Sequence, residues 1–202
     1  DLSSTGNYGN NLWKYDYDAD AWEEMESWVP TTEGRNPIGI RYPTVGVDTD
    51  RGFMHLFDGD TDGGKLDAHL LYDIEADEWK TNKQMPVEAN EISMGATDGY
   101  VVLTGGNWRD RDSPYVYDIE ANEWNEITGE WDANNNSHRG SYAVGIDGDV
   151  YWFGDENGDD NTYKYTPSTD TYHGRVDNMN RYRQYPSGAV DYDNKYIYAV
   201  GT

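Results

Sequence analysis

The chain contains no cysteine and no long apolar run. The first absence excludes disulfide bonds, thiolate nucleophiles and thiolate metal ligands. The second excludes a membrane-spanning helix, which needs roughly 18 consecutive apolar residues, so we expect no insertion into a membrane. The sequence begins at Asp1, without a methionine or a signal-peptide pattern, and we expect either a mature processed form or an excised domain.

Basic and aliphatic residues are both scarce. The chain has 15 Lys+Arg against 39 Asp+Glu, a formal net charge of −24, which repels phosphates and excludes nucleic acid as an expected partner. Leucine, isoleucine, valine and phenylalanine together make up only about 15% of the residues, which is typical of disorder in a highly charged chain. However, 18 tyrosines and 8 tryptophans at regular spacing favour a folded β-protein instead.

The acidity itself points to an environment. Dense carboxylates hold hydrated cations, and high salt screens their mutual repulsion. We therefore expect a halophilic source, with an ordinary acidic domain or a calcium-loaded secreted domain as the alternatives.

An eight-residue pattern that runs from tyrosine to tryptophan repeats along the chain. The segment 72–79, Tyr-Asp-Ile-Glu-Ala-Asp-Glu-Trp, recurs almost unchanged at 117–124, more loosely at 15–22, and at 165–172 with a tyrosine in the tryptophan place. The leading tyrosines are 57, 45 and 48 residues apart. Such a period is typical of repeat architectures, in which each repeat is one supersecondary unit.

Two short strands are expected ahead of each Tyr-x6-Trp unit. The nearer strand is almost continuously apolar, as at 100–106, which is typical of a strand buried on both faces. Asp98-Gly99 and Asp147-Gly148 stand between the two strands, and this dipeptide favours a tight hairpin. Each repeat therefore predicts four short antiparallel strands.

These motifs resemble the kelch family, in which a double glycine precedes a tyrosine and a tryptophan that are separated by six residues. Gly105-Gly106 with Tyr117 and Trp124 matches in full, whereas the other repeats keep only one of the glycines. The resemblance implies an all-β fold, a β-propeller of four kelch-like blades with four antiparallel strands each. The repeat positions that it identifies are Tyr15, Trp22, Tyr72, Trp79, Gly105, Gly106, Tyr117, Trp124, Tyr165 and Tyr172.

The expected domain is a single one, residues 1–202, with blades at about 38–80, 92–125 and 140–173. Residues 186–202 supply strands one and two of the last blade and residues 1–23 supply strands three and four, so the termini would close the ring. Kelch-like propellers usually have more blades. A longer parent chain, or two chains that share a larger ring, is therefore an alternative, and the choice between monomer and homo-oligomer stays open.

The predicted ligand site lies in loops on one face of the propeller, because loops vary while the sheets stay fixed. Arginine forks suit carboxylates, sulfates and phosphates, and tryptophans supply flat apolar platforms. The candidate residues are Trp28, Arg35, Trp108, Arg109, Arg111, Trp131, Arg139, Arg175, Arg181 and Arg183. Alternatively, the arginines pair with nearby carboxylates and the tryptophans cap the core.

Two further motifs give candidate sites of other kinds. Residues 58–63, Asp-Gly-Asp-Thr-Asp-Gly, copy the first half of a calcium loop, with Asp58, Asp60, Asp62 and Asp67 as candidate ligands, although the twelfth position holds His69 instead of glutamate. Asp155, Asn157, Asp159 and Asp160 form a second, poorer candidate. Asn135 begins an N-x-S glycosylation sequon, which matters only in an exported protein.

No catalytic motif stands out: the four histidines lack ligand spacing, and neither a phosphate-binding glycine loop nor a serine elbow is present. We therefore predict a noncatalytic extracellular or cell-surface recognition module that binds a protein, peptide or carbohydrate ligand, with calcium as the one conceivable cofactor. A structural subunit of a surface, virion or filament assembly is the alternative, and a glycan-processing enzyme is a more distant one. The cytoplasm of a salt-accumulating archaeon is the alternative location.

Overall fold

The computed structural model describes residues 11–27, 40, 42–48, 51–57, 59–61, 64–106, 114–127 and 140–201. The elements of these residues are antiparallel β-strands and one short 3₁₀ turn, Pro167–Thr169. The expected all-β class is therefore confirmed. Within these ranges no helix has the length and apolarity that crossing a membrane requires.

Three four-stranded sheets follow one another along the chain. Sheet I consists of β3 (Thr44–Asp48), β4 (Phe53–Phe57), β7 (His69–Asp73) and β8 (Glu78–Thr81). Sheet II consists of β9 (Ile92–Thr97), β10 (Tyr100–Gly105), β11 (Tyr115–Asp118) and β12 (Glu123–Glu126). Sheet III consists of β13 (Tyr142–Ile146), β14 (Asp149–Phe153), β15 (Asp159–Thr166) and β16 (Thr171–Arg183).

Three two-stranded sheets complete the described structure. The N-terminal hairpin is β1 (Trp13–Asp16) with β2 (Ala21–Glu24), and the C-terminal hairpin is β17 (Ser187–Asp191) with β18 (Tyr196–Val200). A minor hairpin joins β5 (Asp60–Thr61) to β6 (Gly64–Lys65).

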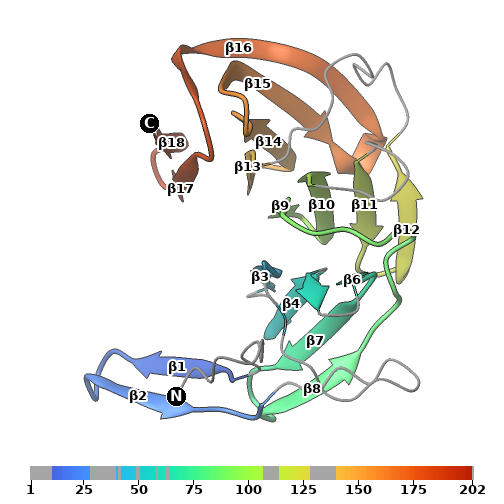
Figure 1. Cartoon of the computed structure of the whole chain (residues 1–202), viewed down its shortest axis with the longest axis vertical. Coiled ribbons are helices and arrows are strands. Elements are labelled where there is room, and N and C mark those ends of the chain that lie inside the picture. The colour runs from blue at the N-terminus through green and yellow to red at the C-terminus, as the bar shows by residue number, and fades with distance from the viewer. Residues whose placement is uncertain are drawn as a thin grey trace.

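The sheets are arranged as an open arc, with β3, β9 and β13 on its inner side and the two terminal hairpins at its ends (Figure 1). The inner strands contact each other in succession, β3 with β9, β9 with β13 and β13 with β17. The expected pairing between the C-terminal and N-terminal strands is not formed: over the described residues, the two hairpins are separate two-stranded sheets.

Tight turns connect the inner strands to their neighbours as the sequence predicts. In the turn between β9 and β10, Asp98 and Gly99 have φ values of 45° and 85°; in that between β13 and β14, Asp147 and Gly148 have 52° and 83°. Positive φ at both central residues is the geometry that favours Asp-Gly in a two-residue hairpin. Both predicted hairpins are therefore confirmed.

The Tyr-x6-Trp unit folds into the same turn in all four places. The tyrosine hydroxyl donates a hydrogen bond to the side chain five residues later; the pairs are Tyr15–Asp20, Tyr72–Asp77, Tyr117–Asn122 and Tyr165–Asp170. The acceptor residue is left-handed each time, with φ between 46° and 54°, a conformation that aspartate and asparagine tolerate better than most residues. The repeat thus encodes a side-chain-bonded turn between the third and fourth strands.

The core lies between neighbouring sheets. One cluster, between sheets I and II, includes Phe57, Leu103 and Tyr117, and a second, between sheets II and III, includes Val102 and Trp152. Because Val102 and Leu103 are adjacent on β10 and point to opposite clusters, this strand is buried on both faces, as its apolar run predicts.

Strand β16 differs from the expectation that Arg175, Arg181 and Arg183 lie in a loop. It continues to Arg183, paired with β15 through several register shifts. Its glycine, asparagines and aspartate are poor strand formers, so pairing with β15 imposes the strand conformation rather than local preference.

Candidate functional site

Most of the predicted ligand-binding residues lie outside the described residues. These are Trp28, Arg35, Trp108, Arg109, Arg111, Trp131 and Arg139. The remaining three, Arg175, Arg181 and Arg183, lie on β16 and not in a loop, which corrects their expected placement. Arg175 donates a hydrogen bond of 2.8 Å to the Asn161 side chain, so at least one of them stabilises the β15–β16 pairing.

The calcium and glycosylation motifs are only partly covered. Asp58, Asp62 and Asn135 lie outside the described residues, whereas Asp60 is in β5 and Asp67 accepts a long hydrogen bond of 3.5 Å from Gln84. In the part of the chain that the structure describes, no three carboxylates or imidazoles gather as a metal site. In the second candidate, Asp155 accepts a hydrogen bond from the Asn157 N–H at 2.7 Å and Asp159 accepts one from the Asn161 side chain.

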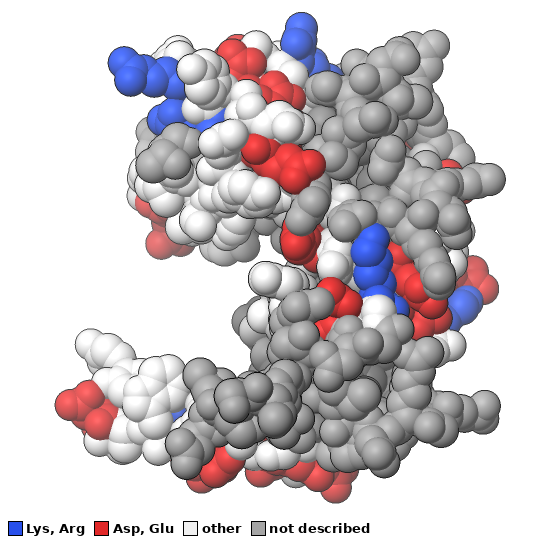
Figure 2. Space-filling view, in the orientation of Figure 1, with Lys and Arg blue, Asp and Glu red and all other residues white. Residues whose placement is uncertain are grey.

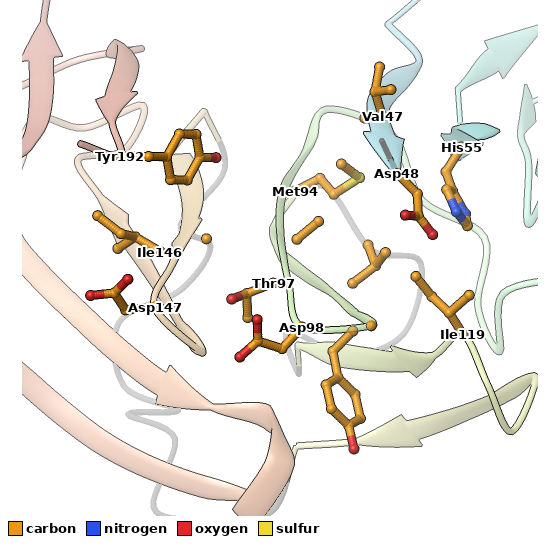
Figure 3. A pocket seen from close by; sticks show the side chains of 16 residues that line it. Val47, Asp48, His55, Met94, Thr97, Asp98, Ile119, Ile146, Asp147 and Tyr192 are labelled. Atoms are coloured by element: carbon orange, nitrogen blue, oxygen red, sulfur yellow. The ribbon is translucent and has the colours of Figure 1, made fainter. Parts of the chain in front are cut away.

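A pocket of about 330 Å³ opens where the first hairpins of the three sheets converge (Figure 3). Its wall combines apolar side chains with carboxylates and one imidazole. The apolar part includes Val47, Met94, Ile119 and Ile146, and the polar part includes Asp48, His55, Asp98 and Asp147. We call it the hairpin pocket. The sequence singled out Asp98 and Asp147 as turn residues only and none of the eight as a binding residue, since they come from segments about fifty residues apart.

A buried pair of histidines lies behind this pocket. His55 Nδ1 is 2.9 Å from His69 Nε2, and His69 Nδ1 is 3.2 Å from the Lys83 carbonyl oxygen. Because a carbonyl only accepts, His69 donates from Nδ1 and accepts at Nε2, so His55 donates from Nδ1. Burial lowers the pKa of both, that of His69 to about 3, and both imidazoles are therefore neutral at neutral pH.

The remaining nitrogen of His55 is an unused acceptor. His55 is 2% exposed and lines the hairpin pocket, and its Nε2 has no hydrogen-bond partner in the described structure. In the tautomer given above this atom holds a lone pair and no proton. A buried acceptor without a partner is costly, and a donor group that reached this atom would remove that cost.

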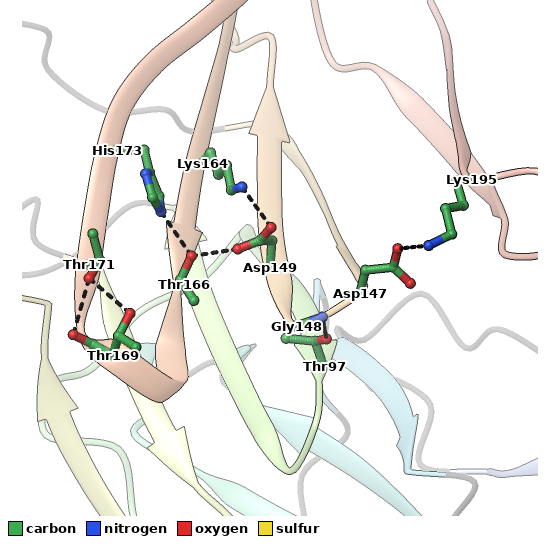
Figure 4. Close-up of polar contacts among 10 residues, drawn as sticks. All are labelled: Thr97, Asp147, Gly148, Asp149, Lys164, Thr166, Thr169, Thr171, His173 and Lys195. Atoms are coloured by element: carbon green, nitrogen blue, oxygen red, sulfur yellow. Dashed lines mark hydrogen bonds and ion pairs between the residues drawn. The ribbon is translucent and has the colours of Figure 1, made fainter.

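Two of the pocket carboxylates are already paired with cations. Asp48 forms an ion pair of 3.1 Å with Arg51, and Asp147 forms one of 2.5 Å with Lys195 (Figure 4). Asp98 has no such pair among the described residues. Among the described residues Asp98 is therefore the one of these three carboxylates without an ion pair, on a surface where acidic groups are spread widely (Figure 2).

A second pocket, of about 410 Å³, lies at the opposite ends of the inner strands. We call it the tyrosine pocket, because Tyr42 and Tyr185 line it and both are exposed. Left-handed residues recur around it just ahead of the four inner strands: Tyr42, Glu91, Gly140 and Tyr185, with φ from 43° to 71°. A bulky residue rarely adopts this conformation, and such outliers gather at binding sites.

The geometry of the two pockets permits binding. The hairpin pocket places acceptors, Asp98 and His55 Nε2, beside an apolar wall, which suits a cationic group on an aliphatic stem. The tyrosine pocket offers aromatic faces, which suit a sugar ring or a peptide.

A scan against protein-family models finds no match, and a search of curated proteins finds no significant match either.

Proposed function

We propose that this chain is a noncatalytic recognition module built as a kelch-like β-propeller. Sheets I, II and III would be three blades, while the C-terminal hairpin supplies strands one and two of a fourth blade and the N-terminal hairpin supplies strands three and four. The four matching Tyr-x6-Trp turns and the succession of inner strands support this assignment.

The ligand that fits best is the basic side chain of a peptide, bound in the hairpin pocket. The observation behind this choice is His55 Nε2, a buried acceptor with no partner in the described structure, on the wall that also holds Asp98. A lysine or arginine head would donate to both groups while its methylene stem packs against Met94 and Ile146. The net charge of −24 would attract such a ligand from a distance.

A carbohydrate is the second candidate ligand, and it would bind in the tyrosine pocket. The exposed rings of Tyr42 and Tyr185 favour it, because aromatic faces pack against the apolar face of a sugar. The acidic composition favours an extracellular or cell-surface location in a salty medium for either ligand.

A titration with a short Gly-Lys repeat peptide tests the main proposal. Binding is monitored by NMR in about 1 M salt, which screens diffuse charge attraction. Asp98→Asn should weaken binding about tenfold, the effect of losing one charge-assisted hydrogen bond. Glu75→Gln is the matched control, because it removes one charge from the exposed β7–β8 turn, and it should leave binding unchanged.

Equal weakening by Asp98→Asn and Glu75→Gln would show nonspecific charge attraction and would overturn the proposal. A neutral disaccharide could instead bind the native chain and Tyr17→Ala equally well but bind Tyr185→Ala less well. That result would make a carbohydrate, and not a basic peptide, the proposed ligand. Tyr17 is the control because it is exposed in the distant β1–β2 turn.

A further inference from the structure

The two terminal hairpins expose side chains whose counterparts in the sheets are buried. Tyr15 is 43% exposed, whereas the equivalent tyrosines are at most 4% exposed: Tyr72, Tyr117 and Tyr165. Val200 is 62% exposed, whereas the residues at its place on the second strands are at most 3% exposed: Phe57, Thr104 and Phe153. Each hairpin thus has the side chains of half a sheet without the other half.

Each hairpin also leaves the matching strand edge unpaired. In the three sheets the second strand pairs with the third, as β10 does with β11. The C-terminal hairpin ends in a second strand, β18, and the N-terminal hairpin begins with a third strand, β1, and in the described structure neither has a neighbour on that side. Exposed edges of this kind are templates for pairing with another strand.

The register of such a pairing follows from the sheets. In sheet III Tyr151 lies opposite Lys164, and at the same place in sheet II Val102 lies opposite Val116. The equivalent pair across the hairpins is Tyr198 opposite Lys14. The neighbouring pairs are then Tyr196–Asp16, Ile197–Tyr15 and Ala199–Trp13. No like charges oppose each other in this register, although the chain is strongly acidic.

Within one chain the two edges are fixed at opposite ends of the arc. The N-terminal hairpin is attached to sheet I: the Glu26 N–H donates to Asp77 at 2.8 Å, and Trp79 Nε1 donates to the Glu26 carbonyl at 2.9 Å. Sheet I contacts sheet II in the same manner, since Trp124 Nε1 donates to the Lys83 carbonyl at 3.0 Å. The N-terminal hairpin therefore continues the contact between sheets that the structure already contains.

The C-terminal hairpin is attached to sheet III in turn. Lys195 pairs with Asp147 at 2.5 Å (Figure 4), and Gly188 packs so closely against Tyr142 that an added Cβ would lie 2.8 Å from its ring. In this structure the arc holds the two edges apart (Figure 1). A second copy supplies a partner for each edge, and by symmetry each chain gives one edge and receives one.

We propose that two copies of this chain pair edge to edge, β18 of one with β1 of the other, with Tyr198 opposite Lys14. The pairing completes two four-stranded sheets and buries Tyr15 and Val200 in the manner of their counterparts. It involves no pocket residue, so it stands apart from the ligand proposal. The net charge of −24 makes the association depend on salt, which screens repulsion between the copies.

Disulfide trapping tests this pairing directly. Because the chain has no native cysteine, only the introduced cysteines can form a disulfide. Lys14→Cys and Tyr198→Cys are made in separate chains, mixed in about 1 M salt and oxidised. Directly opposite Cα atoms lie about 5 Å apart, within disulfide reach, so the mixture should give a product of twice the 23.0 kDa chain mass. Lys14→Cys with Tyr196→Cys is the control, since diagonal Cα atoms lie about 7–8 Å apart.

The chain that contains both Lys14→Cys and Tyr198→Cys separates the two modes of closure. Under the proposal it also forms a product of two chains. Disulfide formation within a single chain would show that the hairpins of one copy join each other, and would overturn the proposal. A mixture that traps no more product than the off-register control would overturn it as well.

Discussion

His55 donates from Nδ1 to Nε2 of His69 across 2.9 Å, in the interface between sheets I and II. Phe57, Tyr117 and Trp124 surround the pair with aromatic rings. Neither imidazole has room for a water shell, so the pair is stable only while both rings are neutral. The hydrogen bond thus joins His69 in the core to His55, which lines the hairpin pocket.

The histidine pair should make the fold sensitive to acid. Because burial lowers the pKa of each histidine below its value in the unfolded chain, the unfolded state binds more protons once the pH falls below about 6.5. Their contribution to stability is therefore complete above about pH 6.5, and each histidine loses about 1.4 kcal/mol per pH unit below it, until the pH reaches the folded-state pKa. Asp48 opposes the shift at His55 and Arg51 adds to it.

Thermal melting between about pH 7 and pH 5 measures this effect. The native chain should lose melting temperature steeply on acidification, and His69→Gln should lose less, although it is less stable at neutral pH. His173→Gln is the control, because His173 is exposed on β16, and it should follow the native chain. Parallel curves for the native chain and His69→Gln would show that carboxylates, and not this pair, govern the acid response.

The repeated hydrogen bond from the tyrosine hydroxyl should stabilise the fold only where it is buried. Tyr165→Phe removes a hydroxyl that donates to Asp170 at 2.8 Å, from a tyrosine that is fully buried. We expect a loss of about 1 kcal/mol, the net value of such a bond. In urea this moves the midpoint by roughly 0.5 M.

Tyr15→Phe is the matched control in solutions dilute enough to keep the chains unpaired, because Tyr15 then makes the same bond to Asp20 on an exposed hairpin where water replaces it. Its midpoint should not change. Equal losses in the two variants would mean that the bond acts through the turn itself and not through burial.

The local parts of this structure could be predicted from the sequence because they depend on neighbouring residues. In the Tyr-x6-Trp turns, Asp16, Asp73 and Asp118 each accept a hydrogen bond from the N–H three residues later. Turn chemistry of this kind is visible in any single copy of the motif, and four copies reinforce it. The four-strand repeat followed for the same reason.

The candidate site could not be predicted in the same way, because it depends on contacts between distant segments. The hairpin pocket joins turns from three sheets, and its acceptor, His55, takes its tautomer from His69 and the Lys83 carbonyl. Lone histidines on different strands show no ligand spacing in the sequence. The extension of β16 to Arg183 depends likewise on pairing with β15.

Close packing of β13 against β9 should make Gly145 intolerant of any side chain. A Cβ at Gly145 would lie 1.8 Å from the Ala96 carbonyl oxygen, which is backbone and cannot turn aside. Gly145→Ala therefore requires the two inner strands to separate, and we expect a loss of about 3 kcal/mol or more. Urea unfolding, followed by circular dichroism, measures the loss.

Gly174→Ala is the control for backbone strain without a clash. Gly174 has a φ of +72°, and nothing lies within 4 Å of an added Cβ, so the cost should be about 1 kcal/mol. If Gly145→Ala costs no more than Gly174→Ala, the inner strands are not as tightly packed as described. If Gly145→Ala fails to fold while Gly174→Ala folds, the packing is supported.

The acidic surface should make stability rise with salt. The net charge of −24 comes from 39 acidic residues against 15 basic ones, and exposed ion pairs such as Lys14–Glu23 contribute little. Between about 0.1 M and 1 M salt the screening length falls from about 10 Å to about 3 Å, so repulsion within the folded chain weakens. We expect the melting temperature to rise by roughly 5 °C, the equivalent of 1–2 kcal/mol in a chain of this size.

Sodium and potassium chloride should act alike, since screening does not depend on the cation. A further rise with millimolar calcium, absent with magnesium at equal ionic strength, would contradict screening as the whole explanation and would indicate specific binding at the loop that begins at Asp58. Unchanged melting in every salt would mean that the carboxylates are too far apart to repel, and would remove the physical reason for a halophilic source.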